Sequence, residues 1–356
     1  VEDAVQYMKD AATASYSSKG DAIVKMNHDA IDLGVENATE IEIPESWASS
    51  EGEDLLHTAS GGRKDVVDYV NNVANLVNAQ NGYDLPVSAF VDYADGTAPS
   101  GSAAYEKRGM AVEVPTWIPD NCIQCNFCAY VCPHASIRPV AMNADQRANA
   151  PEGTESLKMN GLKEYEFAIS ISPADCQGCG SCVNVCPGMR GNKALEMQPQ
   201  ESQLEAQKLF DYGVDTPVDD AVTNKFKETT VKGSQFKTPL LEFSGACAGC
   251  GETPYAKLVT QLFGDRMYIA NATGCSSIWG ASAPATPYTV DKNGRGPAWS
   301  NSLFEDNAEF GYGMALAQET LRGRLIRNAE ALVEKVENKD VKASLVQFLD
   351  TKDSST

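Results

Sequence analysis

The feature that most constrains this chain is a run of four cysteines that occurs twice between residues 122 and 187. The two copies are Cys122-x2-Cys125-x2-Cys128-x3-Cys132-Pro133 and Cys176-x2-Cys179-x2-Cys182-x3-Cys186-Pro187. Three cysteines at this interval, on a loop that turns back on itself, bring three thiolates to three corners of one iron–sulfur cube. A short helical turn carries the fourth cysteine away, and in two-cluster ferredoxins it ligates the other cube. The spacing therefore predicts two [4Fe–4S] clusters held by interleaved runs.

The interleaving assigns each cysteine to one cluster. The predicted ligand sets are Cys122, Cys125, Cys128 and Cys186, here called site A, and Cys132, Cys176, Cys179 and Cys182, here called site B. Zinc is the first alternative, but each run has a third cysteine that tetrahedral zinc does not need. Disulfides are the second, but they are typical of small secreted chains, and this chain is large and shows no signal-peptide pattern. His134 directly follows the first run, but the four thiolates already complete each cluster, so we do not expect it to be a ligand.

Composition limits the classes of function. The net charge of −20 argues against nucleic-acid binding, which needs a basic surface. The hydrophobic fraction of 42% supports folded cores, while no apolar stretch is long enough for a membrane span. Free thiolates and low-potential clusters indicate a reducing environment, so we expect a cytoplasmic protein.

Hydrophobic periodicity predicts the organisation of the N-terminal part. Residues 1–50 carry two helical patterns, and the alternating residues 40–44 predict a short edge strand that ends at a proline. We expect this part to be the tail of a preceding α/β domain. Residues 51–110 form a linker with one helix over about 63–78, in a background rich in Gly, Ser, Asp and Pro.

Residues 111–200 contain both cysteine runs, and each run has a strand pattern before and after it. The patterns are Val112 to Ile118, Ile137 to Val140, Phe167 to Ile171, and Ala194 to Met197. This arrangement predicts a ferredoxin-like module, with the polar residues 141–164 as an insertion between its halves. Residues 307–336 predict a helix with one packed stripe of leucine and valine, or a helix that binds a partner through this stripe.

The three remaining cysteines lie further along the chain. Cys247-x2-Cys250 follows an apolar strand pattern within a Gly/Ala-rich loop, and by itself fits a redox dithiol, a zinc site or a cluster. Cys275 lies in a second loop, after the buried strand pattern of residues 267–270. Both loops follow strands, where α/β sheets place their ligands.

The order of these motifs resembles the pyruvate:ferredoxin (or flavodoxin) oxidoreductase family. The two cysteine runs are followed by ACAGCGE, IANATGCSSIWG and NSLFEDNAEFG, and the similarity extends to residues 25–27 and 105–109. The resemblance implies that Cys247, Cys250 and Cys275 are three ligands of a third cluster. It also implies that Glu252 and Cys275 contact thiamine diphosphate.

The resemblance also implies a fold class and a limit. We expect an α+β chain, in which the ferredoxin-like 2[4Fe–4S] module is followed by part of an α/β thiamine diphosphate-binding domain over residues 201–356. The Mg²⁺- and diphosphate-binding motif, the pyruvate-binding residues and the fourth ligand of the third cluster are not found. The chain therefore fits an internal fragment that is not catalytically complete, and we assign it no catalytic residue.

The implied activity is oxidation of pyruvate to acetyl-CoA and CO₂, with electrons carried through the clusters to ferredoxin or flavodoxin. The implied intact enzyme is a homodimer that uses coenzyme A. One alternative is an enzyme for another 2-oxoacid, and a second is a plain multi-cluster electron carrier. Because ferredoxins and flavodoxins are acidic, we expect a local basic patch of Arg138, Arg190 and Lys193 to dock the acceptor.

Overall fold

A computed structural model describes residues 1–49, 58–282 and 285–354. The chain divides into two compact units, and each is considered by itself. The first unit consists of the helices α1 (Glu2–Tyr16) and α2 (Asp21–Glu36), followed by a 3₁₀ helix, Glu45–Ser49. Lys9 of α1 and Asp32 of α2 form an ion pair at 2.6 Å, which joins the two helices. The predicted edge strand over 40–44 is wrong: these residues are irregular, and among residues 1–49 no strand offers hydrogen bonds to the alternating pattern.

The second unit begins with a helical segment made of α3 (Lys64–Tyr69), a π-helical turn (Val70–Ala74) and α4 (Asn75–Asn78). This segment confirms the helix predicted over 63–78. Its buried residues include Val66, Val70 and Val73. The following residues form short 3₁₀ turns up to Tyr105, and Tyr105 donates a hydrogen bond to the Gly61 carbonyl.

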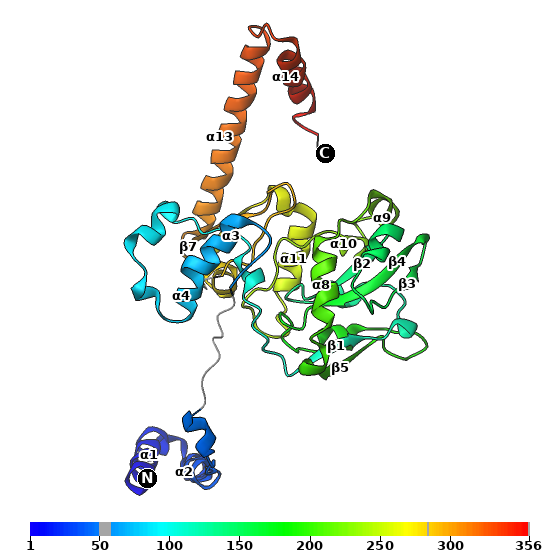
Figure 1. Cartoon of the computed structure of the whole chain (residues 1–356). Helices are drawn as coiled ribbons and strands as arrows, with labels where there is room; N and C mark the ends of the chain where they lie inside the picture. Colours follow the sequence, from blue (N-terminus) through cyan, green and yellow to red (C-terminus); the bar gives the residue numbers. More distant parts are fainter. Residues whose placement is uncertain (50–57, 283–284, 355–356) are drawn as a thin grey trace. The chain divides into compact units, whose positions relative to one another are not determined.

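The strands that flank the cysteine runs form two antiparallel sheets, one of two strands and one of three (Figure 1). The strands of this module are β1 (Glu113–Trp117), β2 (Ile137–Met142), β3 (Leu157–Met159), β4 (Leu162–Ile171) and β5 (Leu195–Pro199). β1, before the first run, pairs with β5, after the second, and β2 pairs with β4. Each strand of one half therefore pairs with a strand of the other half. The four strands predicted around the runs are confirmed, and each run ends in a short helix, α5 (Phe127–Val131) or α7 (Ser181–Val185).

A shared core holds the two halves together. Met142, Phe167 and Leu195 are at most 2% exposed, and Trp117 packs edge-on against Phe167 with ring centroids 6.3 Å apart. Burying a side chain as large as Phe167 stabilises the fold by roughly 1.5–3 kcal/mol. Helix α8 (Ala206–Asp215) covers the β2–β4 sheet (Figure 1), so close that a methyl group on Gly213 would lie 2.7 Å from Val140. The insertion between the halves contributes β3, which pairs with β4, and helix α6 (Ala144–Ala148).

The last part of the second unit is mainly helical. Its helices are α9 (Asp220–Lys225), α10 (Val231–Ser234), α11 (Thr253–Phe263), α12 (Cys275–Ser277), α13 (Asn307–Val333) and α14 (Lys339–Thr351). Its strands β6 (Tyr268–Ala272) and β7 (Ala298–Ser302) form a parallel pair. The described residues as a whole thus have a mixed α+β fold, and none of their helices is both long and apolar enough to span a membrane.

Helix α13 confirms the helix predicted over 307–336. The prediction that its leucines form a packed stripe is wrong. Leu316, Leu321, Leu325 and Leu332 are 43–56% exposed, and Ala329 is buried. The apolar stripe of this helix is therefore largely uncovered by the described residues.

Candidate iron–sulfur sites

The two cysteine loops have the same backbone conformation. Gln124 and Asn126 of the first loop have φ of 60° and 63°, and the equivalent Gly178 and Gly180 of the second have φ of 65° and 70°. Few residues other than glycine adopt this left-handed conformation, so its recurrence in the first loop marks a constrained turn. Gln124 is fixed by two hydrogen bonds, donating to the Lys158 carbonyl at 2.9 Å and accepting from the Asn160 amide at 2.8 Å. Each loop folds back on itself as the spacing predicted.

Site A is a cavity whose lining includes four cysteines: Cys122, Cys125, Cys128 and Cys186. Burial raises the pKa of the Cys122 thiol, although the Trp117 indole and the Gln124 amide oppose the rise. Burial also raises the pKa of Cys128 well above its usual range. A thiol buried in this way stays protonated unless a positive centre replaces its proton.

Site B is a second cavity, lined by Cys132, Cys176, Cys179 and Cys182. Burial raises the pKa of Cys176 to about 12, and it raises that of Cys182 strongly, with a further contribution from Cys132. Cys132 comes from the first run and the other three from the second. The structure thus groups the eight cysteines as the interleaved spacing predicted.

The donor sets of both sites fit a four-iron cluster. Each site offers four thiols, which is the number of ligands that a four-iron cluster needs. Backbone amides point at two of the sulfurs: Gln124 N lies 3.4 Å from Cys122 Sγ, and Gly178 N lies 3.4 Å from Cys176 Sγ. Hydrogen bonds of this kind stabilise the anionic form of a sulfur ligand. Within the described ranges, no three His, Cys, Asp or Glu side chains converge closely enough to hold a single metal ion. A cube of four irons spreads its ligands further apart than a single ion does.

The third site is less complete. Cys250 is partly buried, and its Sγ lies 3.5 Å from the amide of Glu252, which repeats the amide–sulfur pattern of the two runs. Cys247 and Cys275 are exposed, and no interaction links Cys275 to either of the other two in the described part of the chain. The two loops meet instead through Trp279, whose indole nitrogen lies 3.3 Å from a Glu252 carboxylate oxygen.

Parallel strands bring the remaining motifs of this region together. The Cys275 loop follows β6 and the NSLFEDN segment begins in β7, and the two strands run side by side. Asn271 and Asn301, at equivalent positions, are joined by an amide hydrogen bond of 2.8 Å. The carboxyl ends of parallel strands are where α/β sheets bind ligands. Glu252, the other residue expected at thiamine diphosphate, is exposed at the start of α11.

The third-site loop packs directly against site B. His134, two residues after Cys132, is 2% exposed and donates a hydrogen bond of 2.8 Å from Nε2 to the Ala246 carbonyl, directly before Cys247. A methyl group on Gly249 would lie 3.6 Å from the Cβ atom of Cys179. Two independent contacts therefore connect the third site to site B.

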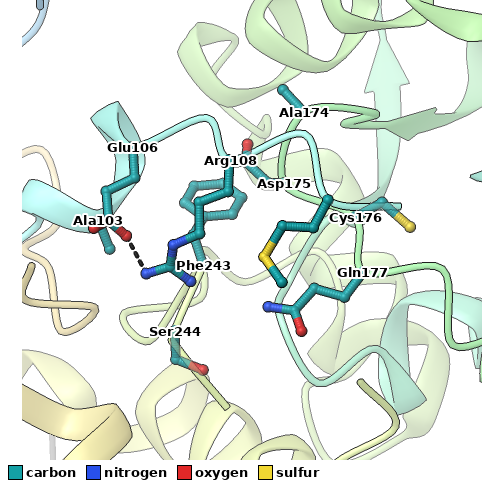
Figure 2. Close-up of a pocket in the computed structure, with 10 residues that line it drawn as sticks. Ala103, Glu106, Arg108, Ala174, Asp175, Cys176, Gln177, Phe243 and Ser244 are labelled. Atoms are coloured by element: carbon teal, nitrogen blue, oxygen red, sulfur yellow. Dashed lines mark hydrogen bonds and ion pairs between the residues drawn. The ribbon is translucent and has the colours of Figure 1, made fainter. Parts of the chain in front are cut away.

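A small pocket lies on the other side of Cys176 (Figure 2). Arg108 points into it and forms an ion pair with Glu106, and Ser244 lies at its edge. Beside Cys176, Asp175 is only 3% exposed and pairs with Lys107 at 2.6 Å. The ion pair between Lys107 and Asp175 thus joins the segment of residues 106–108 to the start of the second cysteine loop.

Comparisons with known proteins agree with this geometry. Residues 121–189 match the model of the 4Fe-4S dicluster domain, and residues 59–111 match EKR, a domain of unknown function. Over 353 residues the chain is 51% identical to pyruvate-flavodoxin oxidoreductase of Klebsiella pneumoniae, covering 99% of this chain and 29% of that protein. Over 357 residues it is 48% identical to pyruvate:ferredoxin oxidoreductase of Moorella thermoacetica, covering 100% of this chain and 30% of that protein. The chain belongs, as one segment, to the pyruvate:ferredoxin/flavodoxin oxidoreductase family.

A further relative widens this family. Pyruvate dehydrogenase [NADP(+)] of Cryptosporidium parvum is 45% identical over 346 residues, covering 90% of this chain and 17% of that protein. The chain thus spans less than a third of the length of each of these relatives. The names of these relatives differ in the electron acceptor, which is flavodoxin, ferredoxin or NADP(+).

One prediction about the surface of this family segment is wrong. Arg138 was expected in an exposed basic patch, but its side chain is 13% exposed and is paired with Glu242, which is 11% exposed. The guanidinium also stacks on Phe210 and Phe243, at 5.1 and 5.4 Å from the ring centroids. Arg138 therefore ties the segment before the third site to the module, and cannot dock a partner. The strand expected in that segment is not formed: it has only an isolated bridge between Leu241 and Tyr288.

Sequence reasoning also missed a buried lysine. Lys257 of α11 is 2% exposed, and its ammonium donates hydrogen bonds to three carbonyls at the end of the first cysteine run. Burial lowers its pKa to about 8. Its position in the amphipathic pattern of α11, on the face that also buries Thr253, Thr260 and Gln261, is the only signal that could have indicated it.

Proposed function

We propose that this chain is the electron-transfer segment of an enzyme that oxidises pyruvate to acetyl-CoA and CO₂. The observation that carries the proposal is the grouping of the eight run cysteines into two cavities of four, each drawing one cysteine from the opposite run. When bound there, [4Fe–4S] clusters would accept and pass on single electrons. The residues proposed to hold them are the four cysteines of site A and the four of site B.

The third site would lie at the entry of the electrons. We assign Cys247, Cys250 and Cys275 to a third cluster, and Glu252 and Cys275 to the neighbourhood of thiamine diphosphate with its Mg²⁺. The amide directed at Cys250 and the parallel strands β6 and β7 support this assignment. We further propose that residues 111–200 form the cluster module and 201–356 part of the thiamine diphosphate domain, after a linker over 51–110 and, over 1–50, the tail of an α/β domain.

The contacts of the third-site loop support one order of transfer. The loop reaches site B through the hydrogen bond of 2.8 Å from His134 and through Gly249, on which an added methyl group would be in van der Waals contact with Cys179. Electrons would therefore pass from the third site to site B, then to site A, and from site A to ferredoxin or flavodoxin. His134 holds the loop at this distance with its Nε2 proton, which is committed to the Ala246 carbonyl.

Pyruvate is favoured over other 2-oxoacids because the relatives are named as pyruvate oxidoreductases or pyruvate dehydrogenases. A plain electron carrier is the second candidate, but it would need neither the β6–β7 pair nor a cysteine loop packed against site B. For the intact enzyme we propose a homodimer that uses coenzyme A.

The order of transfer can be tested with the cluster-loaded chain reduced by dithionite under anaerobic conditions and mixed with oxidised flavodoxin. Cys125→Ser should remove the site A cluster and nearly abolish rapid flavodoxin reduction. The matched variant Cys179→Ser should remove the site B cluster but leave the transfer from site A intact. Equal rates in the two variants would contradict the proposed exit through site A.

A further inference from the structure

Two lysines bind equivalent parts of the two cysteine runs. Lys257 donates to the carbonyls of Ala129, Tyr130 and Cys132, the last two at 3.2 and 3.0 Å. These carbonyls lie at the C-terminal end of α5, where a helix lacks donors of its own for its last carbonyls. Of the three, Ala129 also accepts a hydrogen bond of 3.3 Å from the Cys132 amide. The ammonium therefore closes the end of the first run, directly beside the cysteine that crosses to site B.

Lys193 does the same for the second run. Its ammonium donates to the carbonyls of Val183, Asn184 and Cys186, at 2.6, 2.8 and 3.5 Å. Counted from the third cysteine of each run, these are the same three positions that Lys257 binds in the first. Cys186 is the cysteine that crosses to site A, so each site has one lysine beside its crossing cysteine.

The two lysines differ in their surroundings. Lys193 is exposed and comes from the loop that follows the second run, whereas Lys257 is 2% exposed and comes from α11, 125 residues beyond Cys132. Three acceptors use all three N–H donors of an ammonium, and a neutral amine could not supply them. No carboxylate pairs with Lys257 within the ranges that the structure describes.

A buried ammonium without a carboxylate is costly unless another negative charge lies nearby. Lys257 is hydrogen-bonded to the Cys132 carbonyl at 3.0 Å, which places its ammonium beside a ligand of site B. Burial lowers the pKa of Lys257 most, Cys132 and Cys128 raise it, and Arg138 lowers it further. A four-iron cluster held by four thiolates is an anion, and an added electron makes it more negative. Attraction to a fixed cation is stronger in a dry interior than at the surface, where water and salt screen it.

We propose that Lys257 is a positioning residue of site B, whose buried ammonium stabilises the reduced cluster there and so raises its reduction potential. The inference rests on the proposed function, because it requires a cluster at site B. Lys193 stands in the same relation to site A but is screened by solvent, so it changes the potential of site A less. Helix α11 begins directly after the Cys247–Cys250 loop. The segment that brings electrons to site B would therefore also raise the reduction potential of that site.

Redox titration followed by electron paramagnetic resonance tests this inference on the anaerobically reconstituted chain. Signals are assigned by their loss in Cys179→Ser for site B and in Cys125→Ser for site A. Lys257→Met should lower the ratio of reduced to oxidised site B at least tenfold at a fixed potential, a shift of about 59 mV for one electron. Lys257→Arg, which keeps the charge, should stay close to wild type, and Lys193→Met should move site A less than Lys257→Met moves site B.

The outcomes separate this inference from the proposed function. Absence of both clusters from the wild-type chain would contradict the proposed function itself. Clusters present, with an unchanged site B potential in Lys257→Met, would overturn the inference alone. If Lys257→Met does not hold site B, Lys257→Gln replaces it, since its amide still donates hydrogen bonds but has no charge, and the same shift is expected. Loss of site B in both neutral variants would show that Lys257 serves assembly only, and would also overturn the inference.

Discussion

At the scale of single residues, a nearly buried ion pair holds the third-site region against the cluster module. Arg138 and Glu242 are both nearly buried, lie 104 positions apart, and form an ion pair flanked by two phenylalanine rings. Removing one partner of a buried pair leaves the other charge without compensation. We therefore expect the intact pair to add little net stability. Its main effect is to hold these two segments in one arrangement.

Replacing Arg138 tests this role. Arg138→Met should lower the free energy of unfolding by about 3–5 kcal/mol, because Glu242 would remain buried and charged. Chemical denaturation monitored by tryptophan fluorescence measures the loss. Lys208→Met is the matched control: its partner Glu205 is 83% exposed, and exposed pairs contribute about 1 kcal/mol at most. A similar small effect at Arg138 would contradict the structural role of the pair.

A buried tyrosine gives the third-site region a pH dependence. Burial, with a smaller contribution from Glu252, raises the pKa of Tyr288 to about 12. A tyrosine in the unfolded chain ionises near pH 10. The contribution of neutral Tyr288 to the free energy of unfolding is therefore complete below about pH 10, and it is lost as the pH rises through the pKa of the folded state. The free energy of unfolding should fall by roughly 2–3 kcal/mol across this window. Urea denaturation should show this fall in the wild type, and Tyr288→Phe should lack it; equal profiles for the two proteins would contradict the shifted pKa.

At the scale of elements, the short helices α5 and α7 each carry a cysteine from its own loop to the opposite site. Cys186 →Ser should therefore remove the cluster of site A, with a loss of about four irons, although site B is nearer in sequence. Cys132→Ser is its mirror image and should remove site B. Iron analysis and electron paramagnetic resonance distinguish the two, and loss of site B in the Cys186 variant would reject the interleaved arrangement.

The sequence predicted the elements whose pattern is local. The spacing of the cysteines indicated both loops and their grouping, because the reach of a short turn depends on only a few residues. The edge strand over 40–44 was wrong because alternation specifies a strand only when a neighbour supplies hydrogen bonds. The leucines of α13 show the periodicity of a packed face but are largely exposed, since periodicity does not reveal what covers a helix.

Residues that act over a long sequence separation could not be predicted. Lys257 and Arg138 are charged, and charged residues are usually exposed, so the sequence favours a surface position for both. Their burial follows from the packing of the third-site region on the module, which is a property of the tertiary fold. Helix α14 was not predicted at all, although its Asn338 caps the helix by accepting hydrogen bonds from two backbone amides.

At the scale of the whole molecule, the charge of −20 must be overcome locally when an acidic acceptor docks. With Arg138 buried, Arg190 and Lys193 are the exposed basic residues of the predicted patch. Lys193 donates to three backbone carbonyls, whereas Arg190, just beyond the second run, forms no ion pair with any residue that the structure describes. Arg190→Gln should slow electron transfer to ferredoxin at low salt, and the difference should vanish at high salt. Arg266→Gln, an exposed arginine elsewhere, is the control. Equal salt profiles for both variants would remove Arg190 from the docking surface.

The central claim is that this one chain holds two interleaved four-iron clusters. The most direct measurement is the iron and acid-labile sulfide content of the anaerobically reconstituted chain after gel filtration, together with its Mössbauer spectrum. We expect about eight irons per chain held tightly in two [4Fe–4S] clusters, with any iron of the incomplete third site lost during filtration. Bound zinc in place of iron, or cysteines paired as disulfides, would contradict it.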